Sequence, residues 1–324
     1  MAAPDIATHP GDTHEIPQYE EHESNTSLKE RIKKHYEIAS DYYYSLWGQH
    51  IHHGYFKSPT ETKEEAQVNL IKYLLEISDL PQGANVIDVG CGIGGTSRYL
   101  AKEHACNVTG ITISGRQVEI AKRLTRAETE TNSTGTSTDD ADVYPSGGNC
   151  RFVELDAEKM LEHFSADGKP AARFDAVWIS EALSHFPDKP LFFRSVSELL
   201  VPGNSSRLVI ADWFKAPQLS PEQEKEDIQP IEDGMLLPRL CTVDEYVEMA
   251  RKAGLQIRQT PIDISGDVAK TWDISWGLVS SPSLWMFAIS QGRDGLAFLQ
   301  AFRAMRRGYA NDTFRYAIMC FEKP

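Results

Sequence analysis

The sequence has few cysteines and no long apolar run, and each shortage excludes a class of protein. Its five cysteines form no CxxC pair and are odd in number, which argues against a disulfide framework and against a zinc site. No stretch approaches the roughly 18 apolar residues that a membrane span needs, so no stable membrane insertion is expected. Residues 1–27 lack the apolar segment of a secretory signal. We therefore expect a reduced, cytoplasmic protein.

Runs of basic residues are also lacking. The 33 Lys and Arg residues are outnumbered by 47 Asp and Glu residues, and the formal net charge is −14. Nucleic acid is not an expected partner, because phosphate binding depends on clustered basic side chains. Hydrophobic residues make up 41% of the 324 positions, so a large buried core is available.

Composition divides the chain into unequal parts. Residues 1–27 are polar, acidic and rich in Pro and Thr, and we expect a disordered tail there. Residues 127–149 are polar and low in complexity, and they are predicted to be a flexible surface insertion that does not pack. The rest is interpreted as a single domain, 28–324, with N-terminal lid helices (28–80), a core (81–215), cap helices (216–310) and a final strand (311–324).

Apolar periodicity predicts strands that alternate with helices from residue 85 onward. An earlier helix is predicted to begin with Ser27 as its N-cap. Such alternation indicates an α/β fold with a mostly parallel sheet, in which ligands bind beyond the carboxyl ends of the strands. Strands are predicted near 85–89, 107–113, 150–155, 174–179, 207–212, 255–264 and 316–321, and helices at 62–77, 114–126, 189–200, 242–253 and 283–308.

The most informative segment is VIDVGCGIGGTSRYLA, at residues 86–101. It reads as a strand, a glycine turn and the start of a helix. Glycine lets the backbone approach a ligand closely, and a helix N-terminus offers unpaired N–H groups. Together these features predict a nucleotide-binding corner.

Two ligands compete for this corner. Gly90, Gly92 and Gly95 satisfy the G-x-G-x-x-G pattern of dinucleotide sites, but such a site needs an acid about 20 residues later, on the next strand. That strand ends here in Thr112 and a serine. Asp88 would also repel a pyrophosphate, whereas it suits a ligand that carries an ammonium and a sulfonium. S-adenosylmethionine is therefore favoured over NAD.

Several segments resemble class I S-adenosylmethionine-dependent methyltransferases. VIDVGCGIGG resembles their first motif. HYEIASDYYYSLWGQHIHHGYF (35–56), GITISGRQ (110–117) and VWISEALSHFPDK (177–189) resemble segments of the tocopherol, sterol and coclaurine-type small-molecule methyltransferases. The segments at 237–255 and 263–274 resemble the tocopherol type. The resemblance implies a Rossmann-like fold with a mostly parallel seven-stranded sheet, helices on both faces and a helical cap. It also implies a small-molecule substrate, and it leaves a homodimer open.

The resemblance implies contacts to the methionyl part of the cofactor. Gly90 and Gly92 would wrap it, and Asp88 would orient the loop and favour the ammonium. Tyr36 matches an aromatic residue that closes over the methionyl group, although a core-packing role is an equal alternative. Ser180 follows the fourth core strand, near the position of the methyl group.

Further contacts are implied at the nucleoside end. Thr112 and Gln117 match positions that contact the ribose, although Gln117 can also be read as a solvated helix residue. Asp156 matches the acceptor for the adenine amino group, and Ala157 would offer its backbone N–H. Glu158 would replace Asp156 if the register slips by two residues.

Glu181 and His185 are the candidates for acid–base catalysis. They are four residues apart, directly after a strand, and histidine suits proton transfer near neutral pH. The alternative for His185 is packing or a backbone hydrogen bond. The cluster of His50, His52 and His53 has no acid or cysteine partner nearby, so no metal site is predicted.

Aromatic residues are the candidates for an apolar substrate pocket, although at least half of them are expected in the core. The function we expect is methylation of a small, largely apolar specialised metabolite, at nitrogen or carbon, by in-line displacement. The alternatives are O-methylation of a phenol or a prenylated quinol, an NAD-type oxidoreductase, and a non-catalytic cofactor-binding protein. The candidate rings are Trp47, Tyr55, Trp272, Trp276 and Trp285, with Tyr42, Tyr43, Tyr44, Met286 and Phe287 beside them.

Overall fold

The structure is a computed structural model that describes residues 24–324 except 132–135, 138–140, 166–172, 204, 279–284, 287 and 290–291. Most of the predicted tail, 1–23, lies outside the described residues. Ser24 is the N-cap of helix α1 (Asn25–Trp47), and its hydroxyl accepts a hydrogen bond from the Ser27 backbone N–H at 3.1 Å. The prediction that the helix begins with Ser27 as its cap is therefore wrong by one turn of helix.

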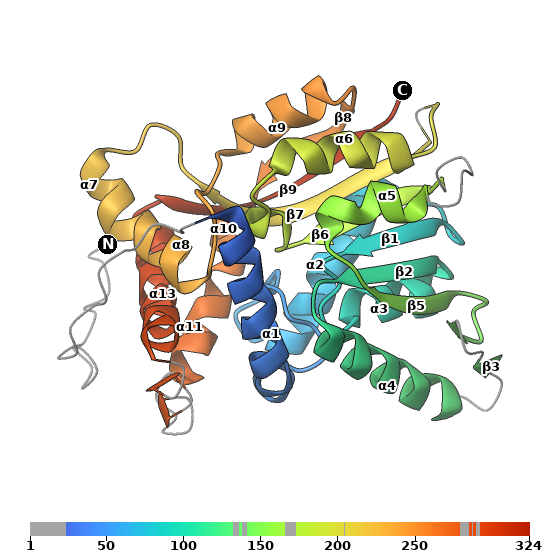
Figure 1. The fold of residues 1–324 in the computed structure, drawn as a ribbon, viewed down its shortest axis with the longest axis horizontal. Helices are drawn as coiled ribbons and strands as arrows, with labels where there is room; N and C mark the ends of the chain where they lie inside the picture. The colour runs from blue at the N-terminus through green and yellow to red at the C-terminus, as the bar shows by residue number, and fades with distance from the viewer. Residues whose placement is uncertain are drawn as a thin grey trace.

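A nine-stranded sheet runs through the centre of the molecule (Figure 1). Its order is β3-β4-β5-β2-β1-β6-β7-β9-β8, in which β5, β2, β1, β6 and β7 are parallel and β9 is antiparallel to both neighbours. The predicted α/β class and mostly parallel sheet are confirmed, and β3 and β4 extend the seven longer strands. The strands are β1 (Asn85–Val89), β2 (Asn107–Thr112), β3 (Thr136–Ser137), β4 (Asp142–Val143), β5 (Asn149–Glu154), β6 (Ala176–Ser180), β7 (Arg207–Lys215), β8 (Gln256–Asp263) and β9 (Phe314–Glu322).

The central strands bury both faces, as their nearly continuous apolar sequence requires. Alternate residues point to opposite sides: Val86 and Trp178 belong to one core cluster, and Ile87 and Val177 to the other. The first cluster is covered by α2 (Lys63–Ser78), α3 (Gly95–His104), α4 (Gly115–Thr131), α8 (Gln229–Gly234), α11 (Lys270–Leu278) and α13 (Arg293–Ala310), and the second by α5 (Met160–Phe164), α6 (Lys189–Leu199) and α9 (Val243–Lys252).

Local sequence explains where several helices begin. α2 and α9 each start with a capping box, in which the Thr62 and Thr242 hydroxyls accept from the backbone of Glu65 and Glu245, whose carboxylates return the bond. Both helices were predicted within one or two residues. The predicted helix 283–308 corresponds to α13 only from Arg293 onward, and part of its first half lies outside the described residues.

Residues 127–149 were predicted to be a flexible insertion that does not pack, but parts of this segment are ordered and buried. α4 continues to Thr131, β4 pairs with β5, and the side chains of Thr129 and Tyr144 are buried. The Tyr144 hydroxyl also donates to Glu128 at 3.2 Å. The prediction that this segment does not pack is wrong for these residues, because apolar and threonine side chains within a polar stretch still face the core.

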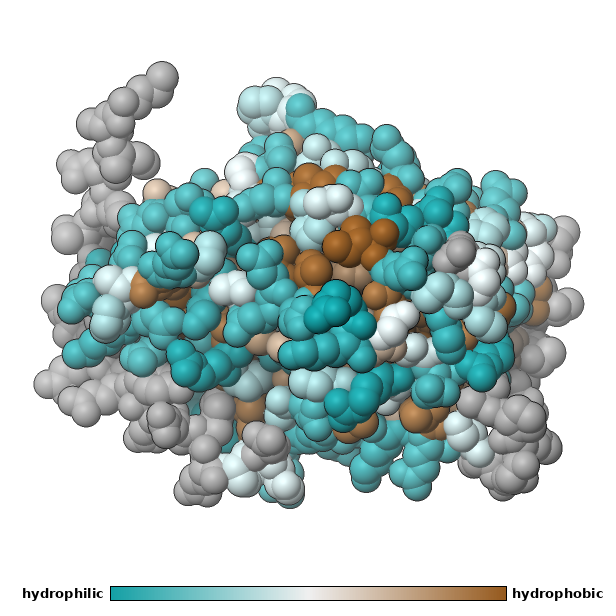
Figure 2. All heavy atoms as spheres, turned by 90° about the horizontal axis from the view of Figure 1, so that it is seen from above, coloured by the Kyte–Doolittle hydropathy of each residue, from teal (hydrophilic) through white to brown (hydrophobic). Residues whose placement is uncertain are grey.

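Several helices lie together beside one end of the sheet. In Figure 1, α8, α11 and α13 lie together on the left, and α1 crosses in front of the sheet beside them. Figure 2 shows the face that carries α6 and α9, which is mostly hydrophilic, with hydrophobic residues gathered near its middle. Within the described part of the chain, none of the helices has the length and apolar character of a membrane span.

Candidate functional site

Two adjoining cavities lie at the carboxyl ends of the parallel strands. The first is bounded by the glycine loop after β1 and by the ends of β2, β5 and β6, with α1 across it. The parallel strands bring together segments that are far apart in sequence, as the fold class predicts. All predicted cofactor residues except Asp88 line this cavity: Tyr36, Gly90, Gly92, Thr112, Gln117, Asp156, Ala157 and Ser180.

The glycine loop is held by constraints that only glycine satisfies. Gly90 and Gly92 have φ angles of 69° and 54°, in the left-handed region. A Cβ on Gly90 would lie 2.3 Å from the Cβ of Ala182. The backbone N–H groups of Gly90 and Cys91 both donate to the Ile111 carbonyl, at 2.9 and 3.0 Å. The loop is thus folded closely against β2 and the segment after β6.

Asp88 lies beside the loop rather than in the first cavity. It lines a smaller cavity with His50, His52 and the glycine loop, and its carboxylate accepts a hydrogen bond from the Ser97 hydroxyl at 2.6 Å. Burial raises the pKa of Asp88 to about 7, although the Ser97 hydrogen bonds oppose the shift. Asp88 therefore joins β1 to the first turn of α3.

The first cavity is polar where Thr112, Gln117 and Asp156 line it. The Thr112 hydroxyl donates to the Gln117 side-chain carbonyl at 2.5 Å, and Gln117 is buried, which excludes the solvated alternative. Lys29 of α1 pairs with Asp156 at 3.0 Å and also with Glu158. Burial lowers the pKa of Lys29, but Glu158 and Asp156 outweigh it and the net shift is upward. Asp156 and Glu158, the two candidates for binding adenine, thus hold α1 across the cavity through Lys29.

The second cavity is apolar and aromatic. Trp47 and Trp272, both predicted substrate residues, line it. Sequence reasoning missed Trp213, whose indole N–H is buried and has no hydrogen-bond partner among the residues described. Phe298 and Phe302, one turn of helix apart on α13, also line it. The other lining residues are Ile32, His35, Tyr36, Ile51, His52, His53, Glu181, His185, Gly234, Met235 and Leu236.

The remaining predicted aromatic residues lie elsewhere. Tyr55 contacts Tyr73, with ring centroids 4.9 Å apart, and the Arg306 guanidinium lies over Trp276 at 5.3 Å. Trp285 packs against the first core cluster. None of Tyr55, Trp276 and Trp285 lines the aromatic cavity, so their assignment to the substrate is not supported by this geometry. Tyr44 does not line it either, Met286 is exposed, and Phe287 and the side chains of Tyr42 and Tyr43 lie outside the described set.

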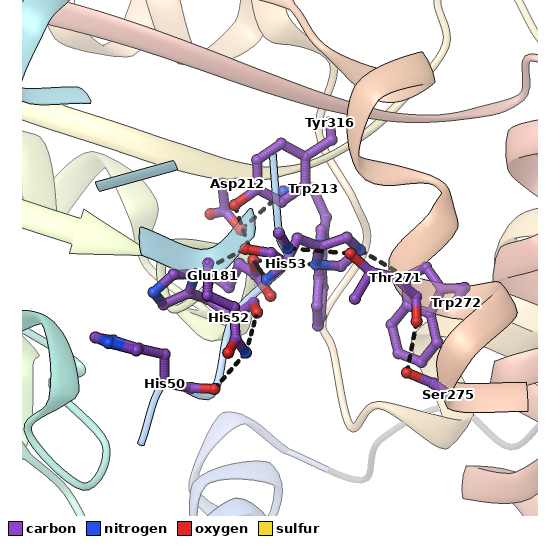
Figure 3. Close-up of polar contacts among 12 residues, drawn as sticks. His50, His52, His53, Glu181, Asp212, Trp213, Thr271, Trp272, Ser275 and Tyr316 are labelled. Atoms are coloured by element: carbon purple, nitrogen blue, oxygen red, sulfur yellow. Dashed lines mark hydrogen bonds and ion pairs between the residues drawn. The ribbon is translucent and has the colours of Figure 1, made fainter. Parts of the chain in front are cut away.

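Glu181 lines both cavities and so lies where they meet. Figure 3 shows its polar contacts. Its Oε1 accepts from the His53 backbone N–H at 2.6 Å and from the Tyr316 hydroxyl at 2.8 Å, and it lies 3.0 Å from His53 Nδ1. Its φ of 55° costs a non-glycine residue roughly 1–2 kcal/mol. Burial raises the pKa of Glu181, but His53 and His52 outweigh it and the net shift is downward.

The segment that contains His53 is fixed from two sides. The buried Gln67 amide of α2 donates to the carbonyls of His50 and His52, at 2.6 and 3.1 Å, and the Gly54 N–H donates to the Thr271 hydroxyl at 3.0 Å (Figure 3). These bonds place the three histidines against the site. Within the described ranges, no group of three His, Cys, Asp or Glu side chains is arranged to hold a metal ion.

His185 also lies at the border of the cavities. It ends a single 3₁₀ turn, η3 (Leu183–His185), and lines both cavities together with Glu181. Burial lowers the pKa of His185 to about 4, although a hydrogen bond with the Leu236 backbone opposes the shift. Its Nδ1 is buried, and no described group bonds to it. The structure thus brings the two predicted acid–base residues together, one anionic and one neutral.

Comparison with known proteins identifies related chains and structures. Residues 23–168 match the family described as mycolic acid cyclopropane synthetase. A probable tocopherol O-methyltransferase from Oryza sativa subsp. japonica is 29% identical, over 92% of this chain and 79% of that protein. The 2-methyl-6-phytyl-1,4-hydroquinone methyltransferase of Synechocystis is 31% identical, over 74% of this chain and 70% of that protein. The solved structure of mycolic acid cyclopropane synthase CmaA1, complexed with SAH and CTAB, superposes with a TM-score of 0.71 at 18% identity and covers 91% of this chain and 98% of that one.

The fold and the cavity at the glycine loop define a class I S-adenosylmethionine-dependent methyltransferase. The chain belongs to this family, near its tocopherol and sterol types. S-adenosylmethionine is its cofactor.

Proposed function

We propose that the chain methylates nitrogen or carbon of a small, largely apolar specialised metabolite. The observation that carries this proposal is the meeting of a polar, glycine-lined cavity with an aromatic one at Glu181 and His185. A methyl donor in the first cavity and an apolar acceptor in the second would face each other across this border. Such alignment is most of what an in-line displacement requires.

We assign the residues of the first cavity to the cofactor. When bound, S-adenosylmethionine supplies a methyl group already activated by a sulfonium. Gly90 and Gly92 would wrap its methionyl part, Thr112 and Gln117 would contact the ribose, and Asp156 would accept from the adenine amino group. Helix α1 lies across the cavity and is held by Lys29, which would exclude water from the reacting atoms.

O-methylation of a phenol or a prenylated quinol is the second candidate. Two relatives are named for tocopherol and for a phytyl hydroquinone, which favours a substrate of this chemistry. A phenol must lose its proton, and a catalytic base works best with a pKa near the working pH. His185, with a pKa of about 4, and Glu181, with a lowered pKa, are weak bases. We therefore rank this candidate below nitrogen and carbon.

A nicotinamide enzyme is disfavoured by the end of β2. The acid that would hold the ribose of NAD is replaced there by the hydrogen-bonded pair of Thr112 and Gln117. We also propose that the chain works in a reducing, cytoplasmic environment. All five cysteines are free, which supports this placement.

Calorimetry with S-adenosylhomocysteine and with NAD tests the cofactor. We expect binding of the first alone. Transfer of labelled methyl groups to a panel of amines, alkenes and phenols then tests the reaction, with mass spectrometry to locate the methyl group. Binding of NAD alone, or labelling of phenols alone, would contradict the proposal.

A further inference from the structure

The aromatic cavity has a single carboxylate among its described lining residues and no lysine or arginine. That carboxylate belongs to Glu181. The walls around it include the rings of Trp47, Trp213 and Trp272. An ion in apolar surroundings is costly unless a charge of opposite sign meets it. Aromatic faces attract cations as well. The cavity is therefore suited to a cation that has an apolar body.

Within the described part of the chain, only one carboxylate oxygen of Glu181 has polar partners. The His53 N–H, the His53 ring and the Tyr316 hydroxyl all reach Oε1, whereas no described donor bonds to Oε2. The Trp272 indole N–H donates to His53 Nε2 at 2.6 Å, so Nε2 is the acceptor and the ring proton lies on Nδ1, facing Glu181. His53 Nδ1 is therefore a donor that fixes Oε1, and Oε2 is left for a ligand.

His185 lies at the same border. Its Nδ1 is buried, and no described group bonds to it. Glu181 and His185 thus both line the meeting point of the cavities. A positively charged group with N–H donors is complementary to the Glu181 carboxylate.

We propose that the methyl acceptor is the nitrogen of an apolar secondary or tertiary amine, bound against Glu181 Oε2 with its hydrocarbon part among the aromatic rings. This inference rests on the proposed methyl transfer. The amine reacts as its free base, whose proton has passed to solvent water before binding. Its nitrogen lone pair forms the new N–CH₃ bond while the S–CH₃ bond breaks, and the electron pair of that bond stays on sulfur. The positive charge passes from sulfur to nitrogen, beside the Glu181 carboxylate. A secondary amine keeps its N–H in the ammonium product and can donate it to Glu181 Oε2.

The first test compares two ligands of the same shape that differ only in charge. Benzyltrimethylammonium and neopentylbenzene are titrated into the full chain, saturated with S-adenosylhomocysteine, and binding is followed by tryptophan fluorescence. We expect the cation to bind about tenfold more tightly or better. The substitution Glu181→Gln should remove most of this difference. Glu248→Gln, which neutralises an exposed acid on α9, is the matched control and should preserve it.

The second test locates the transferred methyl group. 4-Phenylpiperidine, 4-phenylphenol and 1-phenylcyclohexene share an outline but offer an amine, a phenol and an alkene. With labelled S-adenosylmethionine at saturating concentration, we expect methylation of the amine alone and a slower rate in Glu181→Gln.

Several results would overturn the amine assignment. They are equal binding of the two isosteric ligands, binding of neither, and methylation of the phenol or the alkene without the amine. The ligand comparison in the unsubstituted chain needs no variant, so it holds even if Glu181→Gln does not fold. Affinity for S-adenosylhomocysteine, measured on the same sample, separates the two failures. If it is absent, the proposed methyl transfer fails, and if it is present, only the amine assignment fails.

Discussion

Gly90→Ala should damage the site by two separable effects. A side chain at a φ of 69° carries a conformational cost of roughly 1–2 kcal/mol. In addition, the new Cβ would lie 2.3 Å from the Ala182 Cβ, whereas carbon atoms pack at about 3.5–4.0 Å. The loop or the segment after β6 must therefore move by more than about 1 Å. Overpacking of this kind adds roughly 1–3 kcal/mol.

Gly83→Ala is the matched control for this prediction. Gly83 has a φ of 75°, but a Cβ there meets no heavy atom within 4 Å. It should show the conformational cost alone, roughly 1–2 kcal/mol by urea denaturation. Gly90→Ala should lose roughly 2–5 kcal/mol, the sum of both effects, and should also weaken S-adenosylhomocysteine binding by tenfold or more. If both variants lose equal stability and both retain full affinity, close packing of the loop is not what shapes this cavity.

Four further predictions concern the site and its surroundings. Asp156→Ala should weaken S-adenosylhomocysteine binding by about 1–3 kcal/mol in calorimetry, the cost of an unpaired buried group, and unchanged affinity would refute its assignment. His185→Ala should lower turnover and leave cofactor affinity nearly intact; normal turnover would make it structural. Lys29→Met should speed cofactor release in stopped-flow measurements, because α1 loses its pairs with Asp156 and Glu158, and an unchanged rate would show that α1 is held otherwise. Burial raises the pKa of Asp212 to about 7, so the contribution of Asp212 to the free energy of unfolding should fall as pH rises from about 4 to about 7, because the native state holds the extra proton; the free energy of unfolding of Asp212→Asn minus that of the unsubstituted chain should therefore grow with pH over this range, and a difference independent of pH would contradict the shift.

Features with a local sequence pattern were predictable. The glycine loop after β1 is visible because positive φ angles and close contacts require glycine at fixed spacings. The starts of α2 and α9 are visible because a threonine and a glutamate three residues later cap a helix by themselves. Alternation of apolar strands with helices predicts the parallel sheet, and the sheet in turn brings the strand ends to one edge.

Features that depend on contacts between distant segments were not predictable. Oε1 of Glu181 accepts from His53, 128 residues away, and from Tyr316, 135 residues away. Nothing in the sequence around His53 distinguishes a fixed donor from a lid residue. Trp213 and Trp272 line the cavity, whereas Trp276 contacts Arg306 outside it. This difference depends on how the cap helices pack.

The sequence by itself determined the fold class, the cofactor corner and the identity of Glu181 and His185 as the residues at its border. Each of these depends on spacing within one segment or on a strand end, which the chain encodes locally. Only the tertiary structure decided which oxygen of Glu181 is occupied, that His53 Nδ1 donates to it, and which rings enclose the second cavity. These properties arise from hydrogen-bond geometry and side-chain packing between elements that meet only when the sheet and its cap are assembled.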